Sequence, residues 1–373
     1  MKKLKNISTI LFCGLILFGL SLFAWVKAPA GYSMTERRTL SQAPVLSWKA
    51  MEKGTYMEKF EAYATDQFPM RDGFRTLKAV TMKNLFAMRD NHGLYTEDGY
   101  LSKLEYPLNK AKVGISVNKL NEIRKEYLAD TACKTYLSII PDKNYFLAPK
   151  KGYPILDYDT LIDTVKDQVK TECYIDIFDL LSLEDYYFTD QHWKQECILD
   201  VAERIGNAMT DEKFEIKESN YERNLIEMPF YGAYVGQAAL PTDNYGSDLI
   251  TYLSNQEMDA CLVTSYNSGK PSKAFLYDLS KGYGRDPYEM FLSGSDPLLV
   301  IENPTRKNGR ELVVFRDSFG SSLIPLLTAW YEKITVVDLR YMRSNLLGDY
   351  LDFQNQDVLF LYSTLIFNNH ISM

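Results

Sequence analysis

Residues 311–322 read ELVVFRDSFGSS, an apolar run that passes directly into an Asp-Ser pair and then into small residues. The apolar part, 312–315, is short and continuous, as the buried strands of parallel sheets are. A helical pattern over 323–331 follows it. A serine at such a strand-to-helix turn lies at the carboxyl edge of the sheet, where open α/β proteins place their active sites. Ser318 is therefore a candidate nucleophile, and the alternative is an ordinary helix N-cap.

The same rhythm of strand and helix recurs on both sides of this stretch. Short apolar strands are expected at 135–140, 173–178, 334–337 and 358–361, and helices at 113–129, 158–170 and after Trp193. Buried strands that alternate with helices predict an α/β fold with a largely parallel sheet covered on both faces. Residues 221–300 are rich in Tyr and Gly, have strand-like pieces such as 274–277, and predict a β-rich insertion.

A serine hydroxyl is a poor nucleophile without a base, and the chain has three histidines: His92, His192 and His370. His192 lies in the string YFTDQHW at 187–193, two residues after Asp190. An ordinary imidazole has a pKa of about 6.5 and exchanges protons near neutrality. A nearby aspartate fixes its tautomer by accepting a hydrogen bond from the far ring nitrogen. The alternative is that Asp190 caps a helix and His192 is a satisfied, half-buried histidine. His92 lies in a turn-like string and His370 almost at the C-terminus, so both are weaker candidates.

Neighbouring residues complete the expected site. The backbone N–H groups of Ser318 and Gly320, at a helix N-terminus, are expected to stabilise an oxyanion. Trp193 is expected to wall the site and exclude water. Arg340 and Tyr341 come just past a strand end and are expected to contact substrate.

The N-terminus predicts attachment to a membrane. Three lysines, the last at Lys5, precede an uncharged run of twenty residues from Ile7 to Val26. Twenty helical residues span about 30 Å, the thickness of the hydrocarbon core. Lysines stay in the cytoplasm, so the rest of the chain is expected outside it. We expect an uncleaved single-pass anchor, and the alternative is a signal peptide cleaved near the small residues 28–30.

Composition narrows the possible functions. Apolar residues make up 46% and charged residues 24%, as in a globular protein. The net charge is −7 and no basic patch is interleaved with aromatics, so nucleic-acid binding is not expected. Cys133, Cys173, Cys197 and Cys261 allow up to two disulfides in three connectivities, or free buried thiols. No CxxC pair occurs, so neither a metal site nor another cofactor is expected.

Two segments together resemble a known family: TDQHW at 189–193 and RDSF at 316–319. They resemble the DHHW family, named for an Asp-His-His-Trp tetrapeptide, and the alginate O-acetyltransferase group of SGNH-hydrolase-like proteins. In that group the Asp-x-His-Trp string precedes the serine, the reverse of the usual SGNH order. Further segments that resemble family landmarks are ERRTL at 36–40 with Pro44, Tyr63 with Asp66, Phe68, Pro69 and Arg71, DGYL at 98–101, IPDK at 140–143 and DLRY at 338–341. The resemblance spans most of residues 36–365.

The chain departs from the family pattern at two positions. Gln191 stands where the family has its first histidine, which leaves the Asp-x-His pair intact. Arg316 stands where ordinary SGNH hydrolases have glycine. Their Gly and Asn oxyanion donors have no identifiable counterpart here, so the backbone N–H groups near Ser318 are the only oxyanion donors that we expect.

The resemblance implies an SGNH-hydrolase-like fold and O-acetylation of an exported or cell-surface polysaccharide. An integral membrane acyltransferase would deliver the acyl group. We expect His192 to deprotonate Ser318, which accepts the acyl group, and then to activate a sugar hydroxyl. One alternative is a carbohydrate esterase of the same fold, with water as the acceptor. Another is a non-catalytic surface protein that binds polysaccharide through the Tyr-rich insertion, with Ser318 and His192 too far apart to hydrogen bond.

The expected organisation has three parts. Residues 1–30 form the anchor. Residues 31–110 form a stalk and a helical segment. Pro44 lies in the stalk, and Pro29 lies just before it. Residues 111–373 form the SGNH-like catalytic domain, with the insertion at about 221–300.

Overall fold

The structure is a computed structural model that describes residues 2–211, 213–267 and 269–369. The chain divides into two compact units. One comprises the residues up to His92 together with Val235–Asn244, and the other comprises Gly93–Tyr234 and the residues from Tyr245 onward. The second unit contains the large sheet and the residues expected at the site.

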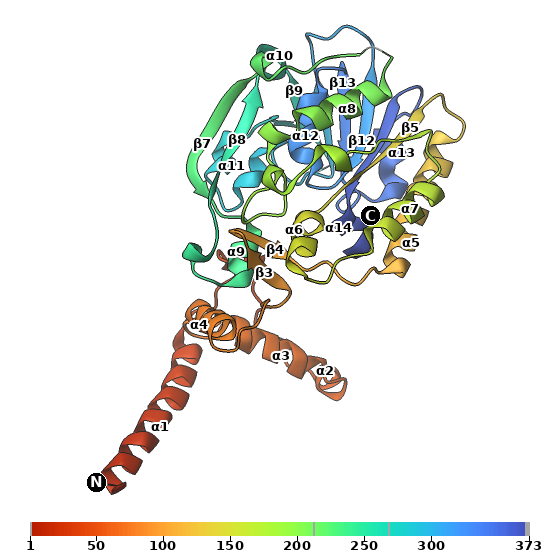
Figure 1. Ribbon diagram of the computed structural model, residues 1–373. Helices are drawn as coiled ribbons and strands as arrows, with labels where there is room; N and C mark the ends of the chain where they lie inside the picture. The colour runs from red at the N-terminus through yellow and green to blue at the C-terminus, as the bar shows by residue number, and fades with distance from the viewer. Residues whose placement is uncertain (1, 212, 268, 370–373) are drawn as a thin grey trace. The chain divides into compact units, whose positions relative to one another are not determined.

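The second unit is built on an eight-stranded sheet of order β10-β9-β11-β13-β12-β14-β5-β6 (Figure 1). The strands from β13 to β6 in this order run parallel, and β10, β9 and β11 continue the sheet in antiparallel fashion. The strand bounds are β5 (Lys134–Ile140), β6 (Cys173–Tyr174), β9 (Leu262–Ser265), β10 (Ser272–Ala274), β11 (Leu298–Glu302), β12 (Glu311–Arg316), β13 (Lys333–Val337) and β14 (Asp357–Ser363).

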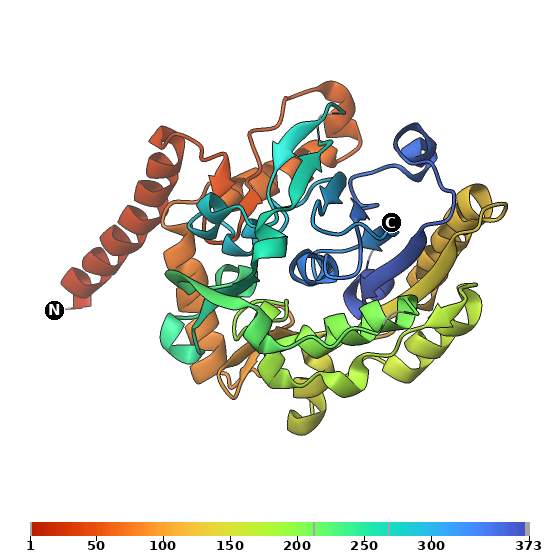
Figure 2. The same ribbon diagram turned by 90° about the horizontal axis from the view of Figure 1, so that it is seen from above.

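Helices cover both faces of this sheet (Figures 1 and 2). Successive residues of a strand point to opposite faces. On β12, Leu312 and Val314 pack in one apolar layer with α8 and α12, while Val313 and Phe315 pack in another with α5 and α7. The helices are α5 (Lys110–Ile123), α7 (Tyr158–Gln168), α8 (Leu199–Met209), α12 (Gly320–Leu327) and α14 (Thr364–Asn369). The predicted α/β fold, a largely parallel sheet flanked by helices, is confirmed.

The strand expected at 173–178 is wrong in its length. Only Cys173–Tyr174 pair with β5, at the edge of the sheet. Beyond them the Asp176 carboxylate accepts the N–H of Phe178 at 3.0 Å, and a 3-10 turn over Phe178–Leu180 follows. An aspartate side chain that hydrogen bonds to the backbone two residues later competes with strand pairing. The strand therefore ends although the apolar pattern of the sequence continues.

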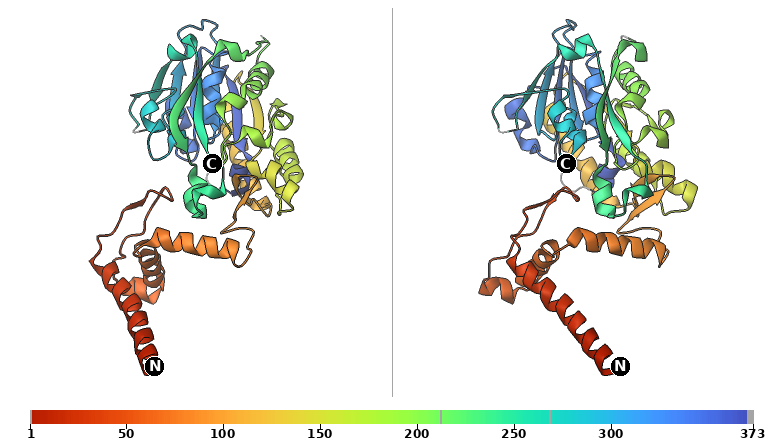
Figure 3. Two further views of the ribbon diagram at one scale, coloured as in Figure 1. Left: turned by 60° about the vertical axis from the view of Figure 1, so that its left-hand side comes forward. Right: turned by 90° about the vertical axis from the view of Figure 1, so that its left-hand side faces the viewer.

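The predicted β-rich insertion is present and divides between two sheets. β7 (Glu222–Phe230) and β8 (Asp248–Ser254) form a separate antiparallel pair, which can be followed in Figure 3. β9, β10 and β11 instead extend the main sheet. The strand expected at 274–277 ends at Ala274, and Tyr277 makes only an isolated bridge to Phe291.

Short elements precede the parallel sheet in the second unit. β3 (Leu94–Glu97) and β4 (Tyr100–Lys103) form a hairpin, and both turn residues, Asp98 and Gly99, have positive φ. That is the backbone of a two-residue turn matched to strand twist. α6 (Lys143–Lys151) follows β5 directly.

The first unit contains the N-terminal helix α1 (Lys2–Val26). Its stretch Lys3–Val26, of mean hydropathy 2.3, is the one helix in the described part of the chain that is long and apolar enough to cross a membrane. None of that stretch is buried. This fits the expected signal anchor and equally a signal peptide. The unit also contains β1 (Tyr32–Ser33), β2 (Arg38–Thr39), α2 (Trp48–Glu52), α3 (Thr55–Asp66), α4 (Arg71–Asn84) and part of α9 (Ala233–Ala238).

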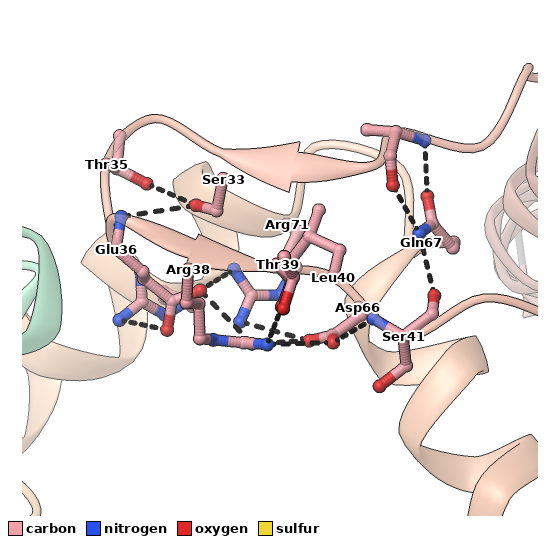
Figure 4. A network of polar contacts seen from close by, with 12 residues as sticks. Ser33, Thr35, Glu36, Arg38, Thr39, Leu40, Ser41, Asp66, Gln67 and Arg71 are labelled. Atoms are coloured by element: carbon pink, nitrogen blue, oxygen red, sulfur yellow. Dashed lines mark hydrogen bonds and ion pairs between the residues drawn. The ribbon is translucent and has the colours of Figure 1, made fainter. Parts of the chain in front are cut away.

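A polar network ties the segment after α1 to α3 and α4 (Figure 4). Arg38 donates two hydrogen bonds to Asp66, at 2.9 and 2.5 Å, and the N–H of Ser41 donates to the same carboxylate at 2.9 Å. Arg71 pairs with Glu36 at 2.5 Å. Paired guanidinium and carboxylate groups of this kind are strong because both partners are charged. The motif ERRTL and the pair Asp66 and Arg71 therefore meet in one structural cluster.

The cysteines form no disulfide in the described residues. Cys133, Cys173, Cys197 and Cys261 are all free thiols, and so is Cys13 in α1.

Candidate active site

Ser318 lies in the turn between β12 and α12, at the carboxyl edge of the parallel strands. The preceding residue, Asp317, holds this turn. One of its carboxylate oxygens accepts the N–H of Phe319 at 3.0 Å, and the other accepts the N–H and hydroxyl of Ser363 at 2.9 and 2.5 Å. Asp317 is buried. It caps the turn and fastens it to the end of β14, so the Ser318 hydroxyl is not the capping group.

His192 reaches Ser318 from a loop 126 positions earlier in the chain. Its Nε2 lies 2.7 Å from the Oγ of Ser318, and its Nδ1 lies 2.5 Å from Oδ1 of Asp190. A proton on Nδ1, donated to Asp190, leaves Nε2 free to accept the serine proton. The structure thus brings Ser318, His192 and Asp190 together in the hydrogen-bond order of a Ser-His-Asp triad. The non-catalytic alternative expected Ser318 and His192 too far apart to hydrogen bond, and they are not.

Asp190 is held as an anion. Burial alone favours the neutral acid, but the adjoining His192 imidazole, its backbone N–H at 3.1 Å and the N–H of Ala233 at 3.1 Å all favour the carboxylate. The pKa of Asp190 consequently lies well below its ordinary value. An ionised partner at this position fixes the tautomer of His192 and stabilises its protonated form.

Gly232 allows another segment of the chain to approach Asp190 closely. A Cβ atom at Gly232 would lie 2.4 Å from the Cβ of Asp190, closer than atoms can approach. The Gly232 N–H donates to Oγ1 of Thr189 at 2.9 Å. A glycine is required here by space, and no sequence pattern singled it out.

Aromatic rings enclose the imidazole. The Tyr288 ring is stacked on His192, and the edge of Phe319 lies with its ring centroid 4.9 Å from that of the imidazole. The Tyr288 hydroxyl and the Oγ of Ser322 are 2.9 Å apart. Burial raises the pKa of Tyr288, so the phenol stays protonated. Sequence reasoning missed Tyr288, because it lies in the insertion, 96 positions after His192, with no motif around it.

Trp193 lies beneath the turn and does not face solvent. Its side chain is fully buried, and its indole N–H donates to the Phe319 carbonyl at 3.1 Å and to Ser322 at 3.0 Å. The residue that the sequence predicted to wall the site is thus buried against the turn that carries Ser318. An indole N–H needs a buried partner, and the Ser318 turn provides one.

The Gly320 N–H donates to the Asp317 carbonyl at 3.1 Å, so this expected oxyanion donor is engaged within the turn. A Cβ at Gly320 would lie 3.0 Å from that of Arg316. The small residue lets the turn pass over the buried arginine.

Arg316, Asp338 and Arg340 form a charged cluster at the ends of β12 and β13. The Arg340 Nε and Nη2 donate to Asp338 at 2.9 and 2.6 Å, and the fully buried Arg316 lies 3.6 Å from the same carboxylate. Phe315 pairs with Val337 in the parallel register, and Ser318 and Arg340 each lie three residues beyond that pair. Arg340 is thus close to the site along the sheet edge, but Asp338 engages its guanidinium.

Tyr341 and Arg340 line a groove of about 730 Å³ between α5 and the segment after β13. Tyr341 is 57% exposed. Ser318, His192 and Asp190 do not line this groove, so the structure places the two expected substrate contacts in a neighbouring depression.

The remaining histidines stand apart from this arrangement. His92 belongs to the other unit, where its Nε2 lies 2.9 Å from the Nζ of Lys78. His370 lies outside the described residues. Among those residues no group of three His, Cys, Asp or Glu side chains is placed to hold a metal ion.

The structure is thus an α/β fold in which a serine that follows β12 faces an Asp-x-His pair from an earlier loop. The chain has the fold of a DHHW family protein from Eubacterium siraeum, with a TM-score of 0.58 and 20% identity over 75% of this chain and 94% of that one. It is also similar to Bacillus cereus PatB1 with a sulfonyl adduct, with a TM-score of 0.60 and 19% identity over 74% of this chain and 97% of that one. A second structure of Bacillus cereus PatB1 gives a TM-score of 0.58 at 16% identity, over 75% of this chain and 99% of that one.

No protein-family model and no curated protein sequence matches the chain. At these identities the likeness to solved structures establishes the fold. It is the fold that the paired motifs around His192 and Ser318 predicted.

Proposed function

We propose that this protein is an extracytoplasmic serine-dependent O-acyltransferase, with Ser318 as nucleophile, His192 as general base and Asp190 as the residue that orients the base. The observation that carries the proposal is the 2.7 Å separation of the Ser318 Oγ and His192 Nε2, with His192 Nδ1 on the ionised Asp190. That separation is within hydrogen-bond reach, which a general base requires.

The first half-reaction acylates Ser318. His192 Nε2 takes the hydroxyl proton while Oγ attacks the carbonyl carbon of the acyl donor. The tetrahedral intermediate collapses as the bond to the leaving group breaks, and His192 returns the proton to that group. An ester of Ser318 remains, and the imidazole is neutral again.

The second half-reaction repeats these steps with a sugar hydroxyl. His192 removes the hydroxyl proton, the sugar oxygen attacks the ester carbonyl, and Ser318 leaves with the proton from His192. The products are an O-acylated sugar and free enzyme. Atoms and charge balance without a metal or an organic cofactor.

A chemical property of activated serines supports a direct probe of this site. Sulfonyl halides are attacked by a serine hydroxyl whose proton a neighbouring base removes. Bacillus cereus PatB1, which shares this fold, has been solved with a sulfonyl adduct. We therefore expect Ser318 to accept a sulfonyl group.

The proposed location and partners follow from the N-terminal helix and the family resemblance. A single-pass α1 with lysines on its cytoplasmic side would hold the site outside the cell membrane. An integral membrane acyltransferase would deliver the acyl group, and an exported or cell-surface polysaccharide would accept it. Substrate contacts are proposed for Arg340 and Tyr341, which line the neighbouring groove.

The test uses the protein in detergent with an activated acetyl ester as donor. We expect acetyl release that disappears in Ser318→Ala and falls by about 10³-fold or more in His192→Ala. Surface Ser280→Ala is a matched control, because Ser280 is exposed, its hydroxyl donates to Asp278, and it does not line the groove. Undiminished release by the Ser318→Ala protein would refute the assignment.

Analysis of the products identifies the acceptor. With an oligosaccharide present, a transferase labels the sugar with the acetyl group. An esterase of the same fold releases free acetate and leaves the sugar unlabelled.

A further inference from the structure

Lys143 is a buried lysine beside the candidate site that the mechanism above does not use. It opens α6, is 2% exposed, and donates three hydrogen bonds from Nζ. The acceptors are the backbone carbonyls of Tyr187, Phe188 and Asp190, at 2.9, 3.2 and 2.7 Å. An ammonium group has three N–H donors, so all of them are used within a single loop.

That loop carries the Asp-x-His pair. The Tyr187 N–H donates to the His192 carbonyl at 3.1 Å, which closes residues 187–192 into a compact loop. From outside, the Asp248 carboxylate accepts the Phe188 N–H at 2.6 Å and pairs with Lys194 at 3.2 Å. The carbonyls therefore converge on one point inside the loop, and Lys143 occupies that point.

Hydrogen-bond acceptors and aromatic rings surround the Lys143 Nζ. The negative ends of three peptide dipoles meet at Nζ. The Phe188 carbonyl also accepts the Leu101 N–H at 2.8 Å, but leaving buried carbonyls such as those of Tyr187 and Asp190 without the Lys143 donor is costly. The rings of Tyr100 and Tyr234 lie with their centroids 5.8 and 5.7 Å from Nζ, within cation–π range. Burial lowers the pKa of Lys143 to about 7, opposed by the charges of Asp190 and Asp248 and assisted by that of Lys194.

The backbone of Lys143 is fixed as firmly as its side chain. Asp142 caps α6 by accepting the N–H of Asn144 at 2.8 Å. Its other oxygen accepts the hydroxyls of Tyr158 and Thr364 at 2.9 and 2.7 Å. The capping aspartate thus anchors the start of the helix to α7 and α14, and Lys143 extends from that anchor into the loop.

We propose that Lys143 is a positioning residue, whose ammonium group holds loop 187–192 in the shape that brings Asp190 and His192 to Ser318. The inference rests on the proposed function of those three residues. Lys143 touches neither the substrate nor the reacting atoms, and it acts through the backbone of Asp190.

Two substitutions test this role in the full-length protein in detergent. Lys143→Met keeps the length of the side chain and removes every donor. Lys143→Gln keeps two N–H donors on a shorter, uncharged side chain. Val165→Ala is the control, since Val165 is a buried residue of α7 in the apolar layer on the α5 side of the sheet. It lowers stability without reaching the loop.

The first measurement is the rate of Ser318 acylation by an activated acetyl ester, at about pH 6, where a lysine of pKa near 7 is charged. We expect a fall of about 100-fold in Lys143→Met, the loss that a displacement of about 1 Å can produce. Lys143→Gln should lie between Lys143→Met and the wild type. The KM for this small ester should change less than about 3-fold, because no substrate contact is removed. Val165→Ala should acylate at the wild-type rate.

The second measurement is the low-field proton resonance of His192 Nδ1–H, which reports the hydrogen bond to Asp190 whether or not the protein is an enzyme. We expect it in the wild type and Val165→Ala, and its loss or broadening in Lys143→Met. A folded Lys143→Met protein with this resonance intact and acylation within about 3-fold of wild type would overturn the inference. If Lys143→Met does not fold, Lys143→Gln decides by the same two criteria. Absence of Ser318-dependent acylation in the wild type would count against the proposed function, and the resonance alone would then decide the role of Lys143.

Discussion

The phenol ring of Tyr288 lies flat on the imidazole of His192, with ring centroids 3.8 Å apart and planes inclined by 3°. The two residues belong to different parts of the chain, the Asp-x-His loop and the β-rich insertion. The stack blocks one face of the imidazole, so His192 can rotate away from Ser318 only by displacing a buried ring. The insertion therefore contributes to the geometry of the candidate site.

Tyr288 variants should separate the ring from its hydroxyl. Tyr288→Phe retains the stack and loses only the bond to Ser322, so we expect kcat within about 3-fold of wild type and a stability loss of about 1 kcal/mol. Tyr288→Leu removes the stacked ring. We expect kcat to fall about 10-fold or more, because the aromatic contact of about 1 kcal/mol is lost and the imidazole is held less firmly. Ester turnover and thermal unfolding measure both effects. Equal kcat losses in the two variants would show that the stacked ring does not hold His192 in place for catalysis.

Asp190→Asn should leave the loop folded and lower kcat by about 10³- to 10⁴-fold. The amide is nearly isosteric, but it cannot stabilise the imidazolium and it favours the wrong tautomer. Because the pKa of Asp190 is depressed, the wild-type carboxylate stays ionised wherever the protein is folded near neutrality. We therefore expect the loss to be similar across neutral and mildly acidic pH, measured as kcat against pH. A loss confined to one end of that range would contradict this role.

Gly232→Ala should impair the site through space alone. The new methyl group would meet the Asp190 Cβ at 2.4 Å, so the Asp-x-His loop must shift. We expect kcat to fall about 100-fold, because a shift of about 1 Å in the positions of Asp190 and His192 can cost that much in rate. Gly114→Ala is the matched control, since nothing lies within 4 Å of its Cβ position in α5 and alanine favours helix. It should retain wild-type turnover and gain up to about 1 kcal/mol of stability.

Asp66 should make the stability of the first unit sensitive to acid. Hydrogen bonds from Arg38 hold the pKa of Asp66 well below its usual range. Its stabilising contribution is therefore fully present above the unfolded pKa of about 3.9 and is lost as pH falls below that value, where the unfolded chain binds the proton first. Asp66→Asn should lower the melting temperature at neutral pH and reduce its further fall in acid. Asp72→Asn, at a 57% exposed side chain, is the control and should change little.

The alternation of apolar residues made much of the fold predictable. The run at 312–315 and its counterparts at 334–337 and 358–361 are continuous because both faces of a central parallel strand are buried. The edge strand at 173–178 was over-predicted, since the apolar pattern cannot report that Asp176 bonds the backbone and ends pairing. The local pattern of apolar residues predicts which segments form strands more reliably than it predicts where those strands end.

The residues of the candidate site were predictable only where the proposed chemistry requires a particular side chain. Ser318, His192 and Asp190 stood out because nucleophile, base and orienting acid each need a particular side chain. Tyr288 stacks on His192, and Gly232 leaves room for Asp190. Residues at any distance along the chain can make such contacts, so no local sequence motif marks them. The sequence marked Trp193 by its place beside His192, but it could not show that the indole N–H donates to the turn after Ser318.

The reactivity of Ser318 tests the central claim most directly. The full-length protein is treated in detergent with an aryl sulfonyl fluoride and digested, and the peptide that contains Ser318 is weighed by mass spectrometry. We predict one sulfonyl group on Ser318, absent in Ser318→Ala and at least about 100-fold slower to form in His192→Ala. An unmodified Ser318 in folded wild-type protein, or labelling at the same rate without His192, would contradict the account.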